Sequence, residues 1–272
     1  MTIFNIGDMV VRKSHGQDIC FTITDIKSDS RSKPVYVLRG IFYRIEADAY
    51  EEDLLKEDYR NVQINLRREI SKVRQNFFRS NYLNRLFFIH RLRRRPGTIL
   101  HIDSSQRFLN MCTKLYNEAG IKSTGHIASE KNQPGIIRRA LFATKPDILV
   151  VTGHDGIRKG NGDLNHVESY RSSKYYIQSV REARRYEPDP DKLCIFAGAC
   201  QSFYEAIMDA GANFASSPAR ININALDPAI LSERVALTDR RYYVTPEEIS
   251  QITISGSGGI GGVNTRGRMV LS

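Results

Sequence analysis

The sequence predicts an α/β protein with a doubly wound, mostly parallel sheet, preceded by a small β domain and a basic helical segment. Three features of the 272 residues lead to this expectation. From Thr98 onward, short apolar runs alternate with segments of helical periodicity, which is typical of parallel sheets with right-handed crossovers. The first 50 residues contain β-branched and aromatic runs separated by polar turns. An arginine-rich stretch lies between them, so we expect domains at 1–50, 51–97 and 98–272.

The composition is that of an ordinary globular protein. A hydrophobic fraction of 41% and a charged fraction of 26% allow a sizeable core. No apolar stretch approaches the roughly 20 residues that cross a bilayer, and the first residues lack the pattern of a secretory signal. We therefore expect a protein that stays inside the cell and binds no membrane.

Four cysteines are scattered along the chain without a Cys-x-x-Cys pair. In a reducing cytosol, three of them are interpreted as small buried hydrophobes: Cys20, Cys112 and Cys194. No histidine and cysteine cluster has the spacing of metal ligands, so we expect neither a disulfide framework nor a metal, and no cofactor. Only Cys200 lies where a predicted strand ends.

The N-terminal domain is expected to be a small SH3-like β-barrel. Polar turns separate four strand-like runs, at residues 9–11, 20–24, 34–38 and 41–45. The dipeptide Arg39-Gly40 suits a tight hairpin between the last two runs. Some barrels of this size bind peptides or nucleic acid and others only dock domains, so the fold leaves its role open.

Residues 60–95 account for the whole net charge of +10, because they hold eleven basic residues and one acidic residue. Apolar residues recur at helical spacing over 66–77, with basic residues on the opposite face. One interpretation is a patch for nucleic acid or another polyanion. The interpretation that we favour is a solvated helix face followed by a linker, which Pro96-Gly97 breaks. A third is that Arg93-Arg94-Arg95 is an exposed cleavage site.

The elements of the third domain follow in regular order. Strands are expected at about 98–103, 121–127, 148–152, 193–199 and 213–218, each a short apolar run. Helices are expected after Ser104 or Ser105, from Gln133-Pro134, over 172–185 and 202–210, and from Asp227-Pro228 and Thr245-Pro246. The glycine-rich tail 256–262 lacks the lysine and the following helix of a phosphate loop. We expect a flexible stretch there, or a tight turn against the sheet.

Two of these strands end in reactive side chains, His154 after 148–152 and Cys200 after 193–199. In open α/β sheets the carboxyl edge is where ligands and catalytic groups lie. Because consecutive strands are usually adjacent, we expect both residues at the same edge, within side-chain reach or nearly so. A histidine that activates a cysteine is a recurring nucleophile.

Several residues compete for the supporting roles. His126 also ends a predicted strand, and His166 lies in a polar loop, so either could act as the base instead of His154. The backbone N–H of Cys200 could stabilise an oxyanion, with Gly156 or Asp155 as the second donor.

The two reactive stretches resemble the motif pair of the caspase, gingipain and legumain group of cysteine peptidases. In that group one strand ends in Thr/Ser-Gly-His-Gly and a later one in Ala-Cys. This chain has Thr152-Gly153-His154-Asp155-Gly156 and Ala199-Cys200, and so differs by the inserted Asp155. The resemblance implies a caspase-hemoglobinase-like fold and a cysteine–histidine dyad.

Nearly the whole chain is similar to a narrower family, the YabG sporulation-specific cysteine peptidases of endospore-forming bacteria. The similarity lies at residues 182–188, 196–202, 212–218, 225–228 and 258–267. It implies a protease of the mother-cell cytoplasm, or of the forespore and spore coat, that processes spore-coat and related precursor proteins. It also implies cleavage next to arginine.

A pocket for arginine needs a carboxylate. Asp163 in the polar loop and Asp227 after the fifth strand are our candidates, with Ser216 and Ser217 lining the pocket. With this specificity, Arg93-Arg94-Arg95 becomes a candidate self-cleavage site.

The sequence thus predicts a cysteine endopeptidase with protein substrates, in which Cys200 is the nucleophile and His154 the general base. The alternative is a non-enzymatic protein that binds nucleic acid or the spore surface through residues 60–95. We disfavour nucleic acid because no base-recognition module is present. The oligomeric state is left open.

Overall fold

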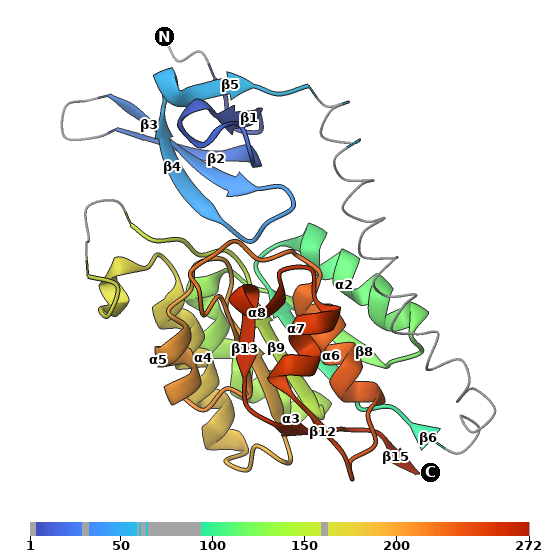
Figure 1. Cartoon of the computed structure of the whole chain (residues 1–272). Coiled ribbons are helices and arrows are strands. Elements are labelled where there is room, and N and C mark those ends of the chain that lie inside the picture. Colours follow the sequence, from blue (N-terminus) through green and yellow to red (C-terminus); the bar gives the residue numbers. More distant parts are fainter. Residues whose placement is uncertain are drawn as a thin grey trace.

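The computed structural model describes residues 4–28, 33–58, 60, 64, 94–158 and 163–271, which form two packed domains (Figure 1). Most of the basic segment, Arg93 included, lies outside these residues. Within the described part of the chain, no helix is long and apolar enough to span a membrane.

The N-terminal domain is a five-stranded antiparallel sheet in the order β4-β3-β2-β1-β5. Its strands are β1 (Met9–Arg12), β2 (Cys20–Ser28), β3 (Pro34–Gly40), β4 (Glu46–Tyr50) and β5 (Leu54–Lys56). One face is a buried apolar cluster that includes Phe21, Ile23 and Leu38. The same cluster extends to Cys200 and Ile223 of the second domain, so the two domains share a core there.

The expected strand at 41–45 is wrong, because β4 begins at Glu46. The N–H of Gly40 donates to the carbonyl of Ile45 at 2.9 Å and closes a loop over these residues. Their apolar character, which suggested a strand, is explained by burial outside a strand: Ile41 and Phe42 pack with Val11 and Cys20 of the same domain, and Ile45 belongs to the cluster that extends to Cys200. We call residues 41–45 the inserted loop.

The second domain contains a six-stranded sheet in the order β13-β11-β10-β9-β7-β8. The strands are β7 (Ile99–Asp103), β8 (Ser123–Ile127), β9 (Ile148–Thr152), β10 (Cys194–Ala197), β11 (Phe214–Ser216) and β13 (Ile260–Gly262). Five strands are parallel, and only β13 runs antiparallel, against β11. The predicted α/β class and mostly parallel sheet are thus confirmed, and part of the glycine-rich tail forms the edge strand.

Helices cover both faces of this sheet (Figure 1). Those of ordinary length are α2 (Gln106–Glu118), α3 (Gln133–Thr144), α4 (Ser173–Tyr186), α5 (Tyr204–Asp209), α6 (Asp227–Leu237) and α7 (Pro246–Ile252). The hydroxyls of Ser105 and Thr245 cap α2 and α7, as expected for these residues before a helix. Shorter pieces are α8 (Gly256–Gly259), β6 (Arg94–Arg95), β12 (Tyr243–Val244), β14 (Thr265–Arg266) and β15 (Val270–Leu271).

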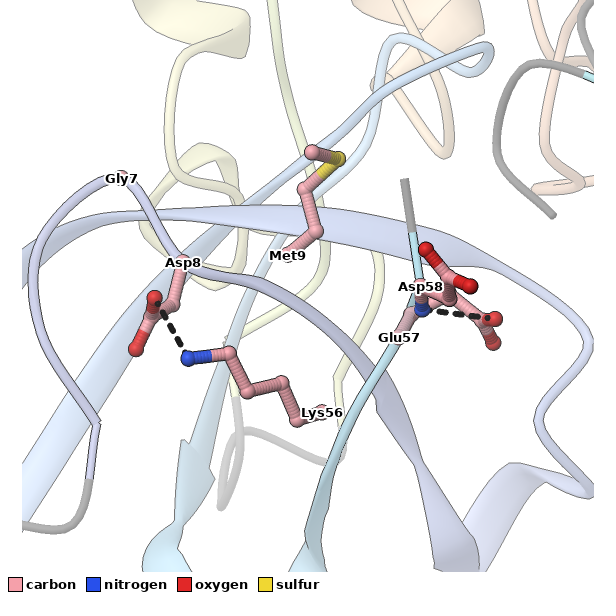
Figure 2. A pocket seen from close by; sticks show the side chains of 6 residues that line it. All are labelled: Gly7, Asp8, Met9, Lys56, Glu57 and Asp58. Atoms are coloured by element: carbon pink, nitrogen blue, oxygen red, sulfur yellow. Dashed lines mark hydrogen bonds and ion pairs between the residues drawn. The ribbon is translucent and has the colours of Figure 1, made fainter. Parts of the chain in front are cut away.

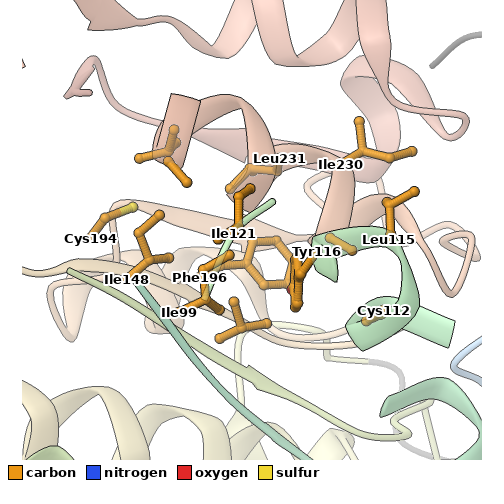
Figure 3. Close-up of a cluster of buried hydrophobic side chains, with 14 of the residues drawn as sticks. Ile99, Cys112, Leu115, Tyr116, Ile121, Ile148, Cys194, Phe196, Ile230 and Leu231 are labelled. Carbon is orange, nitrogen blue, oxygen red and sulfur yellow. The ribbon is translucent and has the colours of Figure 1, made fainter. Parts of the chain in front are cut away.

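Alternate residues of each buried strand enter the cores on the two faces of the sheet. In β9, Ile148 and Val150 belong to one cluster with residues of α2, α6 and α7, whereas Leu149 and Val151 belong to another with residues of α3, α4 and α5. Figure 3 shows Ile148 beside Tyr116 of α2 and Leu231 of α6 in the first cluster. This two-sided burial explains why the strands read as continuous apolar runs. From β7 the chain continues to β8 at one edge of the sheet, and then returns to β9 on the other side of β7. The strand order therefore reverses between β7 and β9, and ligands of open α/β sheets bind at such points.

Candidate active site

The carboxyl ends of three adjacent strands carry Asp103, His154 and Cys200. Asp103 ends β7, His154 follows β9 by two residues, and Cys200 follows β10 by three. β9 pairs with both β7 and β10, so the three residues lie at one edge of the sheet. No hydrogen bond joins His154 to Cys200 among the described residues.

The Cys200 side chain is fully buried beneath the N-terminal domain. Its sulfur accepts a hydrogen bond from the backbone N–H of Ile223 at 3.2 Å, and its own N–H donates to the carbonyl oxygen of Arg44 at 3.2 Å. Burial raises the pKa of the Cys200 thiol to about 12, so it is protonated at neutral pH in this arrangement. Burial also raises the pKa of the other three thiols, those of Cys20, Cys112 and Cys194.

His154 is held by Glu130, which the sequence did not single out, and by Ser104, which was named only as a candidate helix cap. Its backbone N–H donates to Oε1 of Glu130 at 2.7 Å. Its ring Nδ1 lies 3.3 Å from Oγ of Ser104 and 3.7 Å from Oε1 of Glu130. The Phe108 ring lies 5.5 Å from the imidazole, centroid to centroid. The nitrogen Nε2 is therefore the ring atom left for a substrate.

Glu130 is an anion in a nearly closed environment. Burial by itself raises its pKa, but His154, Ser104 and the guanidinium of Arg39 outweigh this and lower the pKa to about 2. Gly153 permits the approach, because a Cβ there would lie 2.5 Å from Oε1 of Glu130. A fixed carboxylate beside a histidine orients the ring.

Asp155, the residue inserted into the motif, ties the loop after β9 to its neighbours. Its Oδ1 accepts from the N–H groups of Gly156 at 2.9 Å and Ser172 at 2.7 Å. Its Oδ2 accepts from the hydroxyls of Ser173 at 2.6 Å and Ser202 at 2.9 Å. Ser202 follows Cys200 by two residues, so this carboxylate fixes the loop that contains His154 relative to the loop that contains Cys200. We call these the two reactive loops.

The backbone N–H groups of Asp155 and Cys200 share one acceptor. Both donate to the carbonyl oxygen of Arg44, at 3.1 Å and 3.2 Å. The N–H of Gly156 is instead used by the Asp155 carboxylate. Two backbone donors that converge on one carbonyl oxygen are the geometry of an oxyanion hole.

The inserted loop has backbone pairing on both sides of this carbonyl position. Before Arg44, the carbonyl of Phe42 accepts from Ala225 N–H at 3.2 Å, and Tyr43 forms an antiparallel bridge with Asn224. These contacts resemble the pairing of a peptide added to a sheet edge.

On the other side of Arg44, the chain pairs with the loop after His154. Ile45 forms a parallel bridge with Asp155, and the N–H of Glu46 donates to the carbonyl of Asp155 at 2.8 Å. A Cβ at Gly156 would lie 2.4 Å from the carbonyl oxygen of Glu46, so glycine is needed for this approach. The Arg44–Ile45 peptide bond therefore lies between the two reactive loops.

The Arg44 side chain fills a pocket of the second domain and has no exposed surface. Its Nη1 donates to Oδ2 of Asp103 at 2.6 Å, and its Nη2 donates to the carbonyl of Ala225 at 3.1 Å. The guanidinium lies 4.8 Å from the centre of the Phe108 ring. An arginine is rarely buried in full without such partners.

Neighbouring hydrogen-bond donors hold the Asp103 carboxylate in place. Its Oδ2 also accepts from the Thr152 hydroxyl at 2.8 Å, and its Oδ1 accepts from Ser105 N–H at 2.8 Å. Burial alone raises the pKa of Asp103, but the Arg44 guanidinium and the contact with His101 lower it well below its usual range. The carboxylate is thus ionised and directed at the guanidinium.

The two carboxylates proposed from the sequence lie elsewhere. Asp163 is exposed, and its Oδ2 lies 3.1 Å from Nε2 of His166. Asp227 begins α6, where its oxygens accept from the N–H groups of Ile254 at 2.8 Å and Ser255 at 3.1 Å. Burial raises the pKa of Asp227 to about 6. Neither carboxylate meets the one guanidinium that occupies the site.

Ser216 ends β11 and Ser217 follows it, next to the loop that contains Cys200. Ser217 accepts from the N–H of Gln201 at 3.1 Å and donates to the carbonyl of Ile221 at 2.7 Å. Ser216 is buried, and within the described part of the chain its hydroxyl has no hydrogen-bond partner. Of the competing histidines, His126 is exposed on β8 and His166 is in the exposed pair with Asp163.

The candidate self-cleavage run is only partly described. Arg94–Arg95 forms β6 and pairs with Val270–Leu271 of β15. Arg93 lies outside the described residues.

A pocket of about 480 Å³ lies on the N-terminal sheet, apart from these residues (Figure 2). Its lining is Gly7, Asp8, Met9, Lys56, Glu57 and Asp58. Lys56 and Asp8 pair across it at 3.2 Å, and the lining contains no cysteine, histidine or hydroxyl nucleophile. Among the residues with described positions, no cluster of His, Cys, Asp or Glu has the arrangement of a metal site.

The sequence contained a usable indication of two residues that were missed. Asp103 closes the predicted strand 98–103, and Glu130 follows the predicted strand 121–127, so both fall at the same edge as His154. The role of Arg44 had no such indication, because it lies in another domain and was taken for a strand residue.

Comparison with known proteins gives a consistent result. Residues 5–272 match the family model described as YabG peptidase U57. The chain is 36% identical over 281 aligned positions to the sporulation-specific protease YabG of Bacillus subtilis (strain 168), covering 97% of this chain and 96% of that protein.

Proposed function

Because the chain belongs to the YabG peptidase U57 family, we propose that it is a cysteine endopeptidase that cuts proteins after arginine during sporulation. The observation that supports this most strongly is the position of Arg44. Its carbonyl oxygen accepts from the N–H groups of Cys200 and Asp155, and its guanidinium meets Asp103. A peptide bound in this way presents the bond after arginine to Cys200.

In the proposed mechanism, the Cys200 thiolate attacks the carbonyl carbon of the arginine. Negative charge develops on the carbonyl oxygen, where the N–H groups of Cys200 and Asp155 stabilise it. His154 takes the thiol proton and gives it to the leaving amine. Water then hydrolyses the thioester and restores the thiol.

Glu130 and Ser104 are proposed as positioning residues for His154. Ser104 Oγ and Glu130 Oε1 lie on the Nδ1 side of the ring, so Nε2 faces away from them. Contacts with these two residues keep the ring in one orientation while the proton is transferred.

Asp103 is proposed as the residue that selects arginine. The pocket also offers the carbonyl of Ala225 to a second guanidinium nitrogen and the Phe108 ring to its face. A lysine ammonium has neither the planar fork nor the second nitrogen, so it would lose part of these contacts. Asp163 and Asp227 stay as weaker proposals for this role, and Ser216 and Ser217 as proposed lining residues.

The similarity also supports the substrates that we propose, spore-coat and related precursor proteins in the mother cell. The fold of the second domain is proposed to be caspase-like and that of the first SH3-like. Self-cleavage at Arg93-Arg94-Arg95 remains a proposal from the sequence. The alternative, binding of nucleic acid or the spore surface through residues 60–95, depends on a segment that is mostly outside the described residues.

The mechanism is tested with arginyl, lysyl and norleucyl peptides that are otherwise identical. Cys200→Ala and His154→Ala should lose hydrolysis of the arginyl peptide, whereas Cys194→Ala, a buried cysteine of the sheet core, should retain it. Thermal unfolding of each variant shows that the loss is not one of folding. Full hydrolysis by Cys200→Ala would contradict the mechanism, whereas no hydrolysis of any peptide by the folded wild type would favour the binding alternative.

A further inference from the structure

The inserted loop occupies the candidate active site in the manner of a substrate. Backbone pairing continues on both sides of Arg44, with Asn224 and Ala225 before it and Asp155 after it. A loop that merely docked two domains would have no need to place a carbonyl oxygen against the N–H of the nucleophile. This carbonyl is there, and Asp155 supplies the second donor.

The Arg44 side chain supports the same interpretation. It is the most voluminous fully buried side chain in the described part of the chain, and it enters a pocket that the other domain builds. The carboxylate of Asp103 and the carbonyl of Ala225 accept from its guanidinium. Apolar side chains usually stabilise a contact between two domains at least as well as a buried ion pair, because they carry no desolvation penalty.

Occupation of the site by the inserted loop has a direct consequence for other substrates. The loop is covalently attached, so its effective concentration at the site is far above that of a free protein substrate. It also covers Cys200, which has no exposed surface. An incoming arginine can reach Asp103 only after Arg44 has left.

We propose that the inserted loop is an intramolecular substrate: the enzyme cuts its own chain between Arg44 and Ile45, and it does not cut other proteins until this bond is broken. The proposal rests on the proposed function, since it needs Cys200 to be a nucleophile. It places self-cleavage at a different position from the arginine run before Pro96.

The step is an ordinary hydrolysis within one chain. The sulfur of Cys200 bonds to the carbonyl carbon of Arg44, and the bond to the nitrogen of Ile45 breaks. His154 takes the proton of the Cys200 thiol and gives it to that nitrogen, which leaves as an amine. Water then splits the thioester, which leaves a carboxylate on Arg44 and a free thiol on Cys200.

The two products should stay together after the cut. Residues 1–44 contain β1, β2 and β3, whereas β4 and β5 belong to the second product. β4 pairs with β3 over five residue pairs and β5 pairs with β1 over three, so the sheet holds both products. The ends at Arg44 and Ile45 become separate chain termini, and the arginine can leave the pocket.

The experiment is a time course on the full chain, beginning with freshly purified protein. Denaturing mass spectrometry follows the products 1–44 and 45–272, and an arginyl peptide follows hydrolysis of an added substrate. The variants are Arg44→Lys, Cys200→Ala and, as a matched control, Arg94→Gln with Arg95→Gln. Thermal unfolding checks that each variant is folded.

In the wild type, we expect peptide hydrolysis to rise in step with the cut after Arg44. Cys200→Ala should stay intact, and Arg44→Lys should slow the cut and the rise in hydrolysis together, by about 10-fold or more. The control with both arginines of β6 replaced should match the wild type. The rate of the cut should not depend on protein concentration, because the reaction is within one chain.

Full peptide hydrolysis by protein whose Arg44–Ile45 bond is intact would overturn the proposal and leave the proposed function standing. So would activation that accompanies a cut only at another arginine. If neither the cut nor hydrolysis of any peptide occurs, the proposed function itself fails. The wild-type time course distinguishes these results even where Arg44→Lys does not fold.

Discussion

Two buried aspartates at the same edge of the sheet are stabilised in opposite ways. Asp103 receives a full opposite charge from Arg44, and its pKa falls well below the usual range although burial opposes this. Burial raises the pKa of Asp155 to about 6, since its partners are two hydroxyls and two backbone N–H groups without a positive charge. The cationic partner of Asp103 comes from the N-terminal domain, whereas all four hydrogen-bond donors to Asp155 lie in the second domain.

The difference assigns the two aspartates to different roles: Asp103 binds a cation from outside its domain, and Asp155 stabilises the loops of its own domain. The site around Asp155 is complete in the second domain, where it fixes the loops that carry His154 and Cys200. The site around Asp103 is complete only when a guanidinium enters from outside the domain. A buried carboxylate that waits for an external cation is what a specificity pocket needs.

The largest expected effect comes from removing the charge of Asp103. In Asp103→Asn, the guanidinium of Arg44 is left buried without its counter-ion, which costs about 3–5 kcal/mol as long as the loop stays in place. We therefore expect the inserted loop to leave the pocket and iodoacetamide to alkylate Cys200 faster, by about 10-fold or more. Mass spectrometry of the alkylated cysteines over time measures the rate of Cys200 alkylation in Asp103→Asn and in the wild type.

Asp155→Asn is the matched control for that experiment, since no buried cation loses its partner there. An equal rate of Cys200 alkylation in the two variants would show that Arg44 does not depend on Asp103 for its position.

The next effect concerns His154. Replacing Glu130 with Gln removes the buried anion beside Nδ1 and should lower kcat for the arginyl peptide about 100-fold, with little change in KM. Ser104→Ala removes a neutral partner of the same nitrogen and should cost less. The account is contradicted if Glu130→Gln changes only KM, since that would place the carboxylate in substrate binding.

The opposite pKa shifts predict opposite dependences of stability on pH. Because folding raises the pKa of Asp155 to about 6, the folded state holds this proton more tightly. Its contribution is therefore largest below pH 4 and is lost as the pH rises from about 4 to 6, on the order of 2 kcal/mol. Asp103 has a lowered pKa, so its contribution is present above pH 4 and is lost as the pH falls further.

Urea unfolding from pH 3 to pH 7 tests this pair of signs. Asp155→Asn should remove the fall between about pH 4 and pH 6 and leave the loss at lower pH in place. A wild-type slope that survives in Asp155→Asn would mean that another group titrates there, and Asp227, with a pKa of about 6, is then the group to replace next.

The smallest effect compares two glycines of the second domain. A methyl group at Gly153 would meet Oε1 of Glu130 at 2.5 Å, so Gly153→Ala should lower stability by about 1–2 kcal/mol. A methyl group at Gly135 in α3 meets nothing within 4 Å, so Gly135→Ala should raise stability by about 0.5–1 kcal/mol. Chemical denaturation measures both, and equal effects would remove the packing argument for Gly153.

The second domain was predictable because its information is local. Each buried strand is a continuous apolar run, and hydroxyl or proline residues mark the helix starts, so the order of elements followed from patterns of ten to fifteen residues. The positions of His154 and Cys200 at one edge followed from the same order, since parallel strands share their carboxyl edge.

The inserted loop could not be predicted in this way. Its isoleucine, phenylalanine and tyrosine residues have the composition of a strand, and a pattern does not tell which partner buries them. The charged pair of Arg44 and Asp103 is separated by 59 positions in the chain and by a domain boundary. Only the three-dimensional arrangement brings the arginine to Cys200.

The central claim is that Cys200 is the nucleophile of a site that binds arginine. It is tested most directly with an arginyl chloromethyl ketone, which alkylates a cysteine much faster from within a bound complex than from free solution. After the protein has gained peptide activity, we expect one adduct per chain on Cys200, with the lysyl and norleucyl reagents reacting more slowly. Peptide hydrolysis that continues with Cys200 fully alkylated, or an adduct on Cys20, Cys112 or Cys194 alone, would contradict the account.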